Sequence, residues 1–203
     1  MPTDIADAVV IGAGPNGLVA ANALAEAGWD VVLLETNDEV GGAVRSAHVT
    51  APGFVTDLFS AFYPLAAASP VIRDLELANF GLHWVGAPAV LGHALPDGRA
   101  VVLHRNPEHT AASVADFAPG DGQAWLDLFA TWERIRDPLL DALFTPFPPM
   151  VATSKVLRRL GATGTLDFAR MAVSPVRRFA QERFAGEGAA LLLAGNSLHS
   201  DLT

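Results

Sequence analysis

The chain has 203 residues, no cysteine, and a formal net charge of −9 from 13 basic and 22 acidic side chains. Its apolar fraction of 51% and charged fraction of 17% indicate a folded protein with ample material for a core. The acidic balance argues against a nucleic-acid binder held by phosphate contacts. The lack of cysteine excludes disulfides, thiolate metal sites and a redox-active cysteine pair.

The first basic residue is Arg45, so the N-terminal region lacks the positive segment of a secretory signal. The uncharged runs 8–25 and 77–96 contain glycine and proline, which argues against membrane helices, and nothing in the sequence supports membrane association. We therefore expect a cytoplasmic protein.

The N-terminal region follows the order strand, glycine-rich turn, helix, strand and acid. Continuous apolar runs over 8–11 and 31–34 are typical of strands that are buried on both faces of a parallel sheet. A helix is predicted over 16–27 and ends at Gly28, and the second strand ends at Glu35. This order within about thirty residues is the fingerprint of a dinucleotide-binding βαβ unit.

Each residue type in the turn has a physical role. Gly12 permits the tight turn, Gly14 lets a diphosphate approach the backbone, and Gly17 lets the helix pack on the sheet. The free N–H groups that begin the helix point at the diphosphate. Glu35 accepts hydrogen bonds from a ribose diol and repels a 2′-phosphate. The predicted cofactor-binding residues here are Gly12, Ala13, Gly14, Pro15, Asn16, Gly17, Glu35 and Thr36.

The same fingerprint serves FAD and NAD, and the next segment favours FAD. Gly41-Gly42 followed by Arg45 resembles FAD-dependent oxidoreductases that include phytoene desaturases, carotenoid isomerases and amine oxidases. The resemblance implies that the Gly41-Gly42 pair lies against the cofactor and that Arg45 faces the diphosphate. Arg45 is also the first basic residue of the chain, so it is the cation nearest in sequence that can offset the charge of a diphosphate. An NAD-dependent dehydrogenase is the less favoured alternative.

The likeness extends over nearly the whole chain. The segment 52–65 and weaker matches through 95–99 to 194–199 resemble phytoene desaturase-like proteins of the pyridine nucleotide-disulphide oxidoreductase domain-containing protein 2 branch. The resemblance implies that Asp57 and Ser60 lie near the flavin ring, although a cap or turn hydrogen bond explains them equally well. Reduction of a disulfide is excluded because cysteine is absent, and no second dinucleotide fingerprint supports direct reduction by NADPH.

The second part of the chain predicts a hairpin and helices. Apolar runs over 89–95 and 100–104 flank the turn signal Asp97-Gly98, and Asn106 is typical of a helix cap. An amphipathic helix is predicted over 121–144. Two further helices are predicted near 151–160 and 175–185. In the similar family this region belongs to a substrate domain, so we predict two domains, 1–82 and 83–203.

Basic side chains are concentrated late in the chain. Residues 1–150 hold 6 basic and 18 acidic side chains, and residues 151–203 hold 7 basic and 4 acidic side chains. We interpret them as a solvated helix face, with a patch for an acidic partner or lipid headgroups as the alternative. They are Lys155, Arg158, Arg159, Arg170, Arg177, Arg178 and Arg183.

No catalytic constellation and no metal site is predicted. The six histidines show no spacing suited to a metal, and the adjacency of His199, Ser200 and Asp201 is not the geometry of a catalytic triad. In flavoenzymes the cofactor carries out the redox chemistry, so a missing acid/base set is compatible with the family.

These observations predict an α/β fold with a Rossmann-like FAD-binding βαβ unit, a hairpin and a mainly helical substrate-domain portion. The similar proteins are longer, so we expect an N-terminal portion that leaves the sheet edge, one side of the flavin pocket and apolar helix faces exposed, and that a second polypeptide completes. The predicted function is an FAD-dependent oxidoreductase that transfers hydride from an apolar small molecule, as desaturases, isomerases and amine oxidases do. The alternative is a non-catalytic flavin-binding or interaction subunit.

Overall fold

The computed structural model describes residues 5–197, so the sequence His199-Ser200-Asp201 lies outside the described part. The chain forms two compact units, the first ending at Ala67 and the second beginning at Ala68. The predicted boundary at 82/83 concerns cofactor and substrate domains and stays a prediction. The mixed α/β fold, with a Rossmann-like N-terminal unit and a helical C-terminal part, confirms the predicted fold class.

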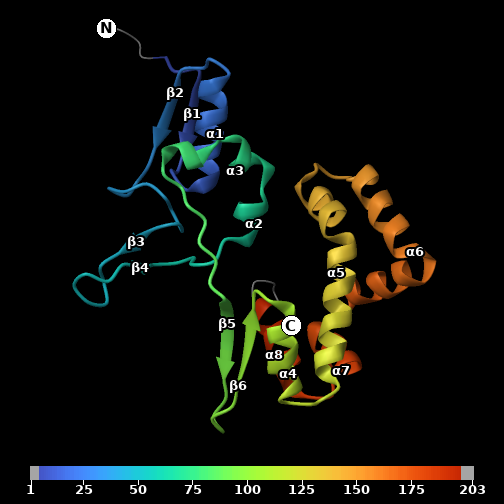
Figure 1. Ribbon diagram of the computed structural model, residues 1–203. Coiled ribbons are helices and arrows are strands. Elements are labelled where there is room, and N and C mark those ends of the chain that lie inside the picture. Colours follow the sequence, from blue (N-terminus) through green and yellow to red (C-terminus); the bar gives the residue numbers. More distant parts are fainter. Residues whose placement is uncertain (1–4, 198–203) are drawn as a thin grey trace. The chain divides into compact units, whose positions relative to one another are not determined.

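The first unit is built on a parallel βαβ arrangement. Strand β1 (Ala8–Ile11) pairs with β2 (Val31–Leu34), and helix α1 (Pro15–Glu26) connects them and packs on the sheet (Figure 1). Gly28 has a φ of +86°, a conformation that suits glycine and turns the chain toward β2. The predicted strands, helix and turn are therefore confirmed.

The sheet formed by β1 and β2 is open on one face. Val10 lies under α1, whereas side chains of the opposite face are exposed. These are Val9 at 56%, Ile11 at 84%, Val32 at 42% and Leu34 at 50%. The expectation of burial on both faces is therefore wrong within residues 5–197. The apolar runs are typical of a parallel sheet that is covered on both faces, and α1 covers one face of this sheet.

Shorter elements follow β2. Strands β3 (Ser46–Ala47) and β4 (Thr56–Asp57) pair antiparallel, and α2 (Pro64–Ala68) leads to the second unit. The second unit begins with α3 (Pro70–Asp74) and the 3₁₀ helix η1 (Leu77–Phe80).

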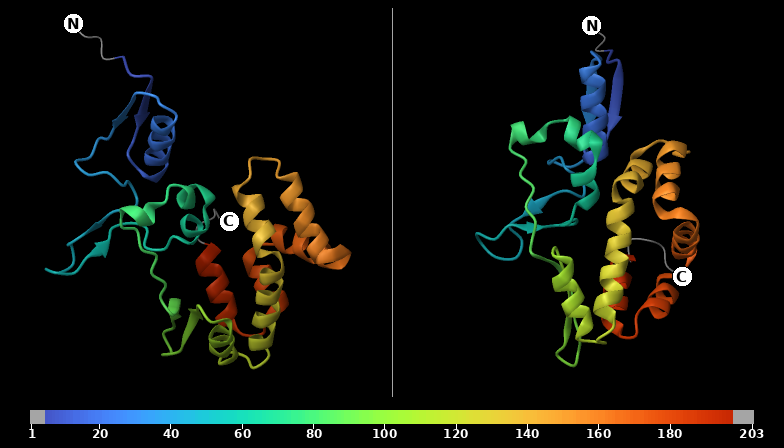
Figure 2. Two further views of the ribbon diagram at one scale, coloured as in Figure 1. Left: turned by 45° about the horizontal axis from the view of Figure 1, so that its top comes forward. Right: turned by 45° about the vertical axis from the view of Figure 1, so that its right-hand side comes forward.

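The core of the second unit lies between a hairpin and helices. Strands β5 (Ala89–Ala94) and β6 (Ala100–His104) pair antiparallel. Helices α4 (Pro107–Ala115) and α8 (Glu187–Ser197) pack against β6, and α5 (Asp121–Phe144) packs against α4 (Figures 1 and 2). The buried cluster consists of Val101, Val114, Phe184, Ala189 and Leu192.

Local signals determine the hairpin and the start of α4. Gly98 has a φ of +86° in the turn, and the Asn106 side chain accepts a hydrogen bond from the His109 N–H at 3.0 Å. Arg99 Nη2 lies 2.8 Å from Asp97 and 2.7 Å from Glu187, which ties the hairpin turn to α8. The predicted turn and cap are confirmed.

Helices α5 and α6 (Met150–Val173) pack against each other around Ile135, Val156 and Leu160. Gly161, with φ 69° and ψ −176°, divides α6 into two helical segments. The first segment and α7 (Val176–Arg183) agree with the predicted helices, whereas the second segment and α8 were not predicted. No helix within the described residues is long and apolar enough to cross a membrane.

Candidate dinucleotide-binding site

The glycine-rich turn joins β1 to α1 in an open conformation. Gly12 has a φ of +93°, and its N–H donates to the Leu34 carbonyl at 2.7 Å. Gly14 precedes α1 without a side-chain cap, and Pro15 is the first helical residue. The helix therefore begins with backbone N–H groups that no capping side chain satisfies, an arrangement that favours an anion.

Gly17 is required by the packing of α1 on the turn. A Cβ at this position would lie 1.9 Å from the Gly12 carbonyl oxygen and 3.6 Å from Val10 Cγ1. Backbone atoms of the turn cannot move this far without breaking its hydrogen bond to β2. The helix thus approaches the turn as the third glycine of the fingerprint predicts.

Glu35, at the end of β2, is bound to the turn. Its Oε2 accepts a hydrogen bond from the Ala13 N–H at 2.7 Å, and Oε1 accepts bonds from Asn37 N–H and Nδ2 at 2.9 and 2.7 Å. The Asn37 N–H, followed by the Ala13 N–H and the Asn37 side chain, lowers the pKa of Glu35 from its ordinary 4.5 to about 2. The carboxylate is therefore ionised well below neutral pH. Thr36 is exposed beside it.

We expect this depressed pKa to appear in the pH dependence of stability. A carboxylate with a lowered folded-state pKa contributes its full stability above the unfolded-state value of 4.5, and loses it as pH falls toward about 2. The carboxyl carbon of Glu35 should titrate near 2 by NMR. Unfolding of the Glu35→Gln chain should depend less on pH in this window than wild type, and equal dependence would contradict the bonds described.

The Gly41-Gly42 loop packs against the glycine-rich turn. The Gly41 N–H donates to the Ala13 carbonyl at 2.7 Å, and a Cβ on Gly42 would lie 3.0 Å from Gly14 Cα. Both residues have positive φ, 117° and 56°. Turn and loop therefore form one backbone surface, and Ala13, which is fully buried, joins the loop, the turn and Glu35. Contact of the pair with a cofactor stays a prediction.

Arg45 is held close to this loop. Its Nε donates to the Gly42 carbonyl at 3.2 Å, and its guanidinium lies 5.6 Å from the centre of the Phe59 ring. The side chain is half-buried. The loop bond and the aromatic contact together fix a cation beside the turn, where it is available to a diphosphate.

Asp57 and Ser60 are also brought to this region. Ser46 Oγ donates to Asp57 Oδ1 at 2.6 Å, and the Ser60 N–H donates to the Ala43 carbonyl at 3.3 Å. These are local structural bonds, and a place near a flavin ring stays a prediction. The sequence reasoning missed Asn37, which holds Glu35, and Phe59, which lies under Arg45.

No metal constellation is found in the part of the chain that the structure describes. Within residues 5–197 no three histidine or acidic side chains gather as metal ligands. His104 and His109 meet edge to face with ring centres 5.6 Å apart, and they show a packing contact. The site is thus a backbone cradle with one acid and one cation.

The comparisons with known proteins agree with this cradle. Residues 10–75 match the NAD(P)-binding Rossmann-like domain family. The chain is 30% identical to a protein of Castellaniella defragrans that is named as a subunit of limonene dehydrogenase, over 66% of the chain and 24% of that protein. It is 29% identical to pyridine nucleotide-disulfide oxidoreductase domain-containing protein 2 of Mus musculus over 97% of the chain and 38% of the relative.

A carotenoid 3,4-desaturase of Haloarcula japonica is 30% identical over 63% of the chain and 26% of its own length. The chain thus spans about a quarter to two fifths of the curated relatives it matches. Together the matches confirm the predicted resemblance to the desaturase-like oxidoreductases, which are an enzyme family.

Proposed function

We propose that the chain supplies the diphosphate-binding part of an FAD-dependent oxidoreductase. The observation that carries the proposal is the bond from Gly41 N–H to the Ala13 carbonyl, because it joins the dinucleotide turn to the loop that bears Arg45. Relatives named dehydrogenase and desaturase support an oxidoreductase. The cytoplasmic location predicted above stays a prediction.

The residues present fit a dinucleotide. A Cβ on Gly14 would meet only Gly42 Cα, at 3.8 Å, so the face of the turn is open to a ligand. The N–H groups that begin α1 and the Arg45 guanidinium would hold the diphosphate, and Glu35 would accept bonds from the ribose diol. When bound, FAD supplies a ring that accepts hydride from an apolar substrate.

A further polypeptide that covers the open face of the β1–β2 sheet is part of the proposal. Four apolar side chains are exposed there, and parallel sheets are normally covered on both faces. The limonene dehydrogenase relative is named as a subunit, which supports a separate chain as the cover. Copurification of the 203-residue chain with a second polypeptide, identified by mass, tests this part.

A non-catalytic protein that binds flavin within a larger assembly is the second candidate. The relative named as a subunit of limonene dehydrogenase favours it, because a subunit can bind a cofactor that acts elsewhere in an assembly. Both candidates require a flavin spectrum, and they differ in what a substrate does. Bleaching of the flavin by an apolar substrate such as limonene or a carotenoid, with no other electron donor present, would favour the enzyme over the non-catalytic protein.

The first experiment is a titration of the chain, together with any copurifying polypeptide, with FAD and with NAD. We expect saturable binding of FAD and its release as the intact nucleotide, identified by mass. In the Arg45→Gln chain, FAD should bind at least about tenfold more weakly, because one charge-assisted contact to the diphosphate is lost.

Arg73 provides a matched control for Arg45. Its side chain is 75% exposed and pairs only with the neighbouring Asp74 among the described residues. Arg73→Gln should bind FAD as wild type does. Equal weakening in both variants, or a preference for NAD, would count against the proposed site.

A further inference from the structure

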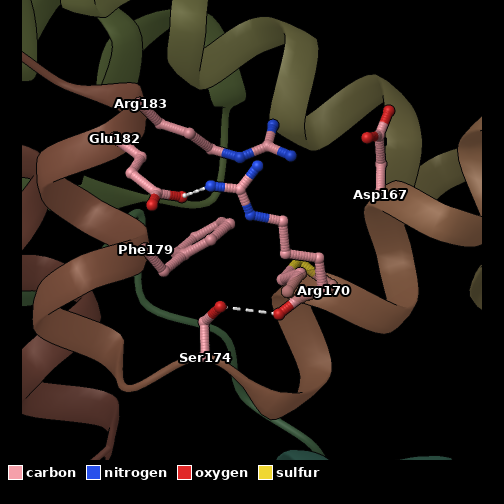
Figure 3. A pocket seen from close by; sticks show the side chains of 7 residues that line it. Asp167, Arg170, Ser174, Phe179, Glu182 and Arg183 are labelled. Carbon is pink, nitrogen blue, oxygen red and sulfur yellow. Dashed lines mark hydrogen bonds and ion pairs between the residues drawn. The ribbon is translucent and has the colours of Figure 1, made fainter.

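A cavity of about 420 Å³ lies between the last turns of α6 and helix α7, within the second unit. Its lining includes Arg170 from α6 and Arg183 from α7. Figure 3 shows the two guanidinium groups directed toward one another across the cavity, with the Phe179 ring beside them. Two like charges that face one another repel, so each needs a balancing carboxylate or a bound anion.

One carboxylate serves two of the arginines in this region. Glu182 accepts from Arg170 Nη2 at 2.8 Å and from Arg178 Nε at 2.9 Å. These two bonds lower the pKa of Glu182, so the group stays ionised. Arg170 is thereby fixed in place. The three arginines Arg170, Arg178 and Arg183 have two carboxylates near them, Glu182 and Asp167.

Arg183 is held by a different contact. Its guanidinium lies 5.0 Å from the centre of the Phe179 ring, and within residues 5–197 no carboxylate lies at ion-pair distance from it. A cation–π contact of this kind uses none of the guanidinium N–H groups as a hydrogen-bond donor to a carboxylate, so they can donate to a ligand. Asp167, the second carboxylate that lines the cavity, is drawn apart from the guanidinium groups in Figure 3.

We propose that Arg170 and Arg183 form a binding site for a phosphate group, carried either by a soluble phosphomonoester or by a lipid headgroup. The arginine fork matches phosphate oxygens with two parallel hydrogen bonds. Arg183 offers such a fork, and Arg170 adds the N–H groups that do not bind Glu182. Glu182 and Phe179 act as positioning residues. All of these residues belong to α6 and α7, so a failure of the dinucleotide site would not affect this proposal, and the reverse also holds.

The test is a titration of the 203-residue chain, and of any copurifying complex, with inorganic phosphate and with phenyl phosphate. We expect saturable binding that Arg183→Gln weakens at least about tenfold. Arg177→Gln is the matched control, because Arg177 lies on the same helix and does not line the cavity; its affinity should stay within about twofold of wild type. Asp167→Asn should tighten binding, because it removes a repelling charge.

A second variant distinguishes loss of the phosphate contact from loss of the folded structure. Arg183→Lys keeps the charge and loses the planar fork, so it should bind with intermediate affinity while its circular dichroism matches wild type. The two sources of phosphate are separated with phosphatidylcholine vesicles, with and without phosphatidic acid. Arg183-dependent binding to the acidic vesicles but not to phenyl phosphate assigns the lipid headgroup, and the reverse assigns a soluble ligand.

Three results would overturn the site. The first is absence of saturable binding at millimolar phosphate and on acidic vesicles. The second is equal weakening by Arg183→Gln and Arg177→Gln, which would indicate diffuse charge. The third is binding of polyglutamate as tightly as phosphate, which would indicate an acidic protein partner.

Discussion

The Gly17→Ala chain is expected to lose about 3 kcal/mol or more of stability in its first unit, and with it all FAD binding. The added Cβ would lie 1.9 Å from the Gly12 carbonyl oxygen, which is a backbone atom of the turn. Either α1 moves away from the sheet or the Gly12 turn breaks. Amide hydrogen exchange of α1 should rise strongly, and it reports on this unit alone.

Gly14→Ala is the matched variant, since here the fold has room for the methyl group. Gly14 has φ −76° and ψ 176°, and the added carbon would meet Gly42 Cα at an ordinary 3.8 Å. We expect wild-type hydrogen exchange in α1 together with FAD binding weakened at least about tenfold, because the methyl group occupies the approach to the turn. Wild-type affinity in this variant would show that the diphosphate does not lie there.

Asp121→Ala is expected to destabilise the second unit by about 3 kcal/mol. Asp121 is 2% exposed in the first turn of α5, and it accepts from the Ala185 N–H at 2.8 Å and the Gly186 N–H at 2.9 Å. Alanine would leave these two part-buried N–H groups without their buried acceptor. The loss should appear as a lower urea midpoint with an unchanged slope.

Two variants make the result specific. Asp121→Asn retains one acceptor oxygen, so it should lose less stability than alanine. Asp127 is exposed on the same helix and its side chain accepts only from the Gln123 side chain among the described residues, so Asp127→Ala should change stability by less than about 0.5 kcal/mol. Similar losses at 121 and 127 would contradict the bridging role of Asp121.

The parts of the fold that were predictable depend on neighbours in the sequence. The turn at Gly98 and the Asn106 cap each involve residues within a few positions of one another. The glycine spacing of the dinucleotide turn likewise encodes a local backbone path. Such features need no knowledge of the rest of the chain.

The contacts that complete the candidate site were not predictable in this way. Glu35 was expected to face a ribose, and its bond to the Ala13 N–H depends on how the end of β2 meets the turn. In the second unit, which holds no part of the candidate site, the bonds from Ala185 and Gly186 to Asp121 likewise join residues far apart in sequence. No periodicity or turn signal reports such pairings.

Two helical segments were missed for a different reason. Helix α8 is apolar on nearly all sides, so it lacks the polar stripe by which a surface helix is recognised. The second segment of α6 follows Gly161 and contains Gly164 and two threonines, which are weak helix formers. Tertiary packing decides the conformation of both.

The bare side of the β1–β2 sheet has a consequence for handling the protein. Each of these two strands also has an edge with free main-chain donors and acceptors within the described residues, next to Ile11 and Leu34, which are 84% and 50% exposed. Such strands recruit further strands from whatever chain is nearest. Molecules made in excess should therefore self-associate at the N-terminal unit, and Ile11→Lys should delay precipitation without disturbing α1 on the opposite side.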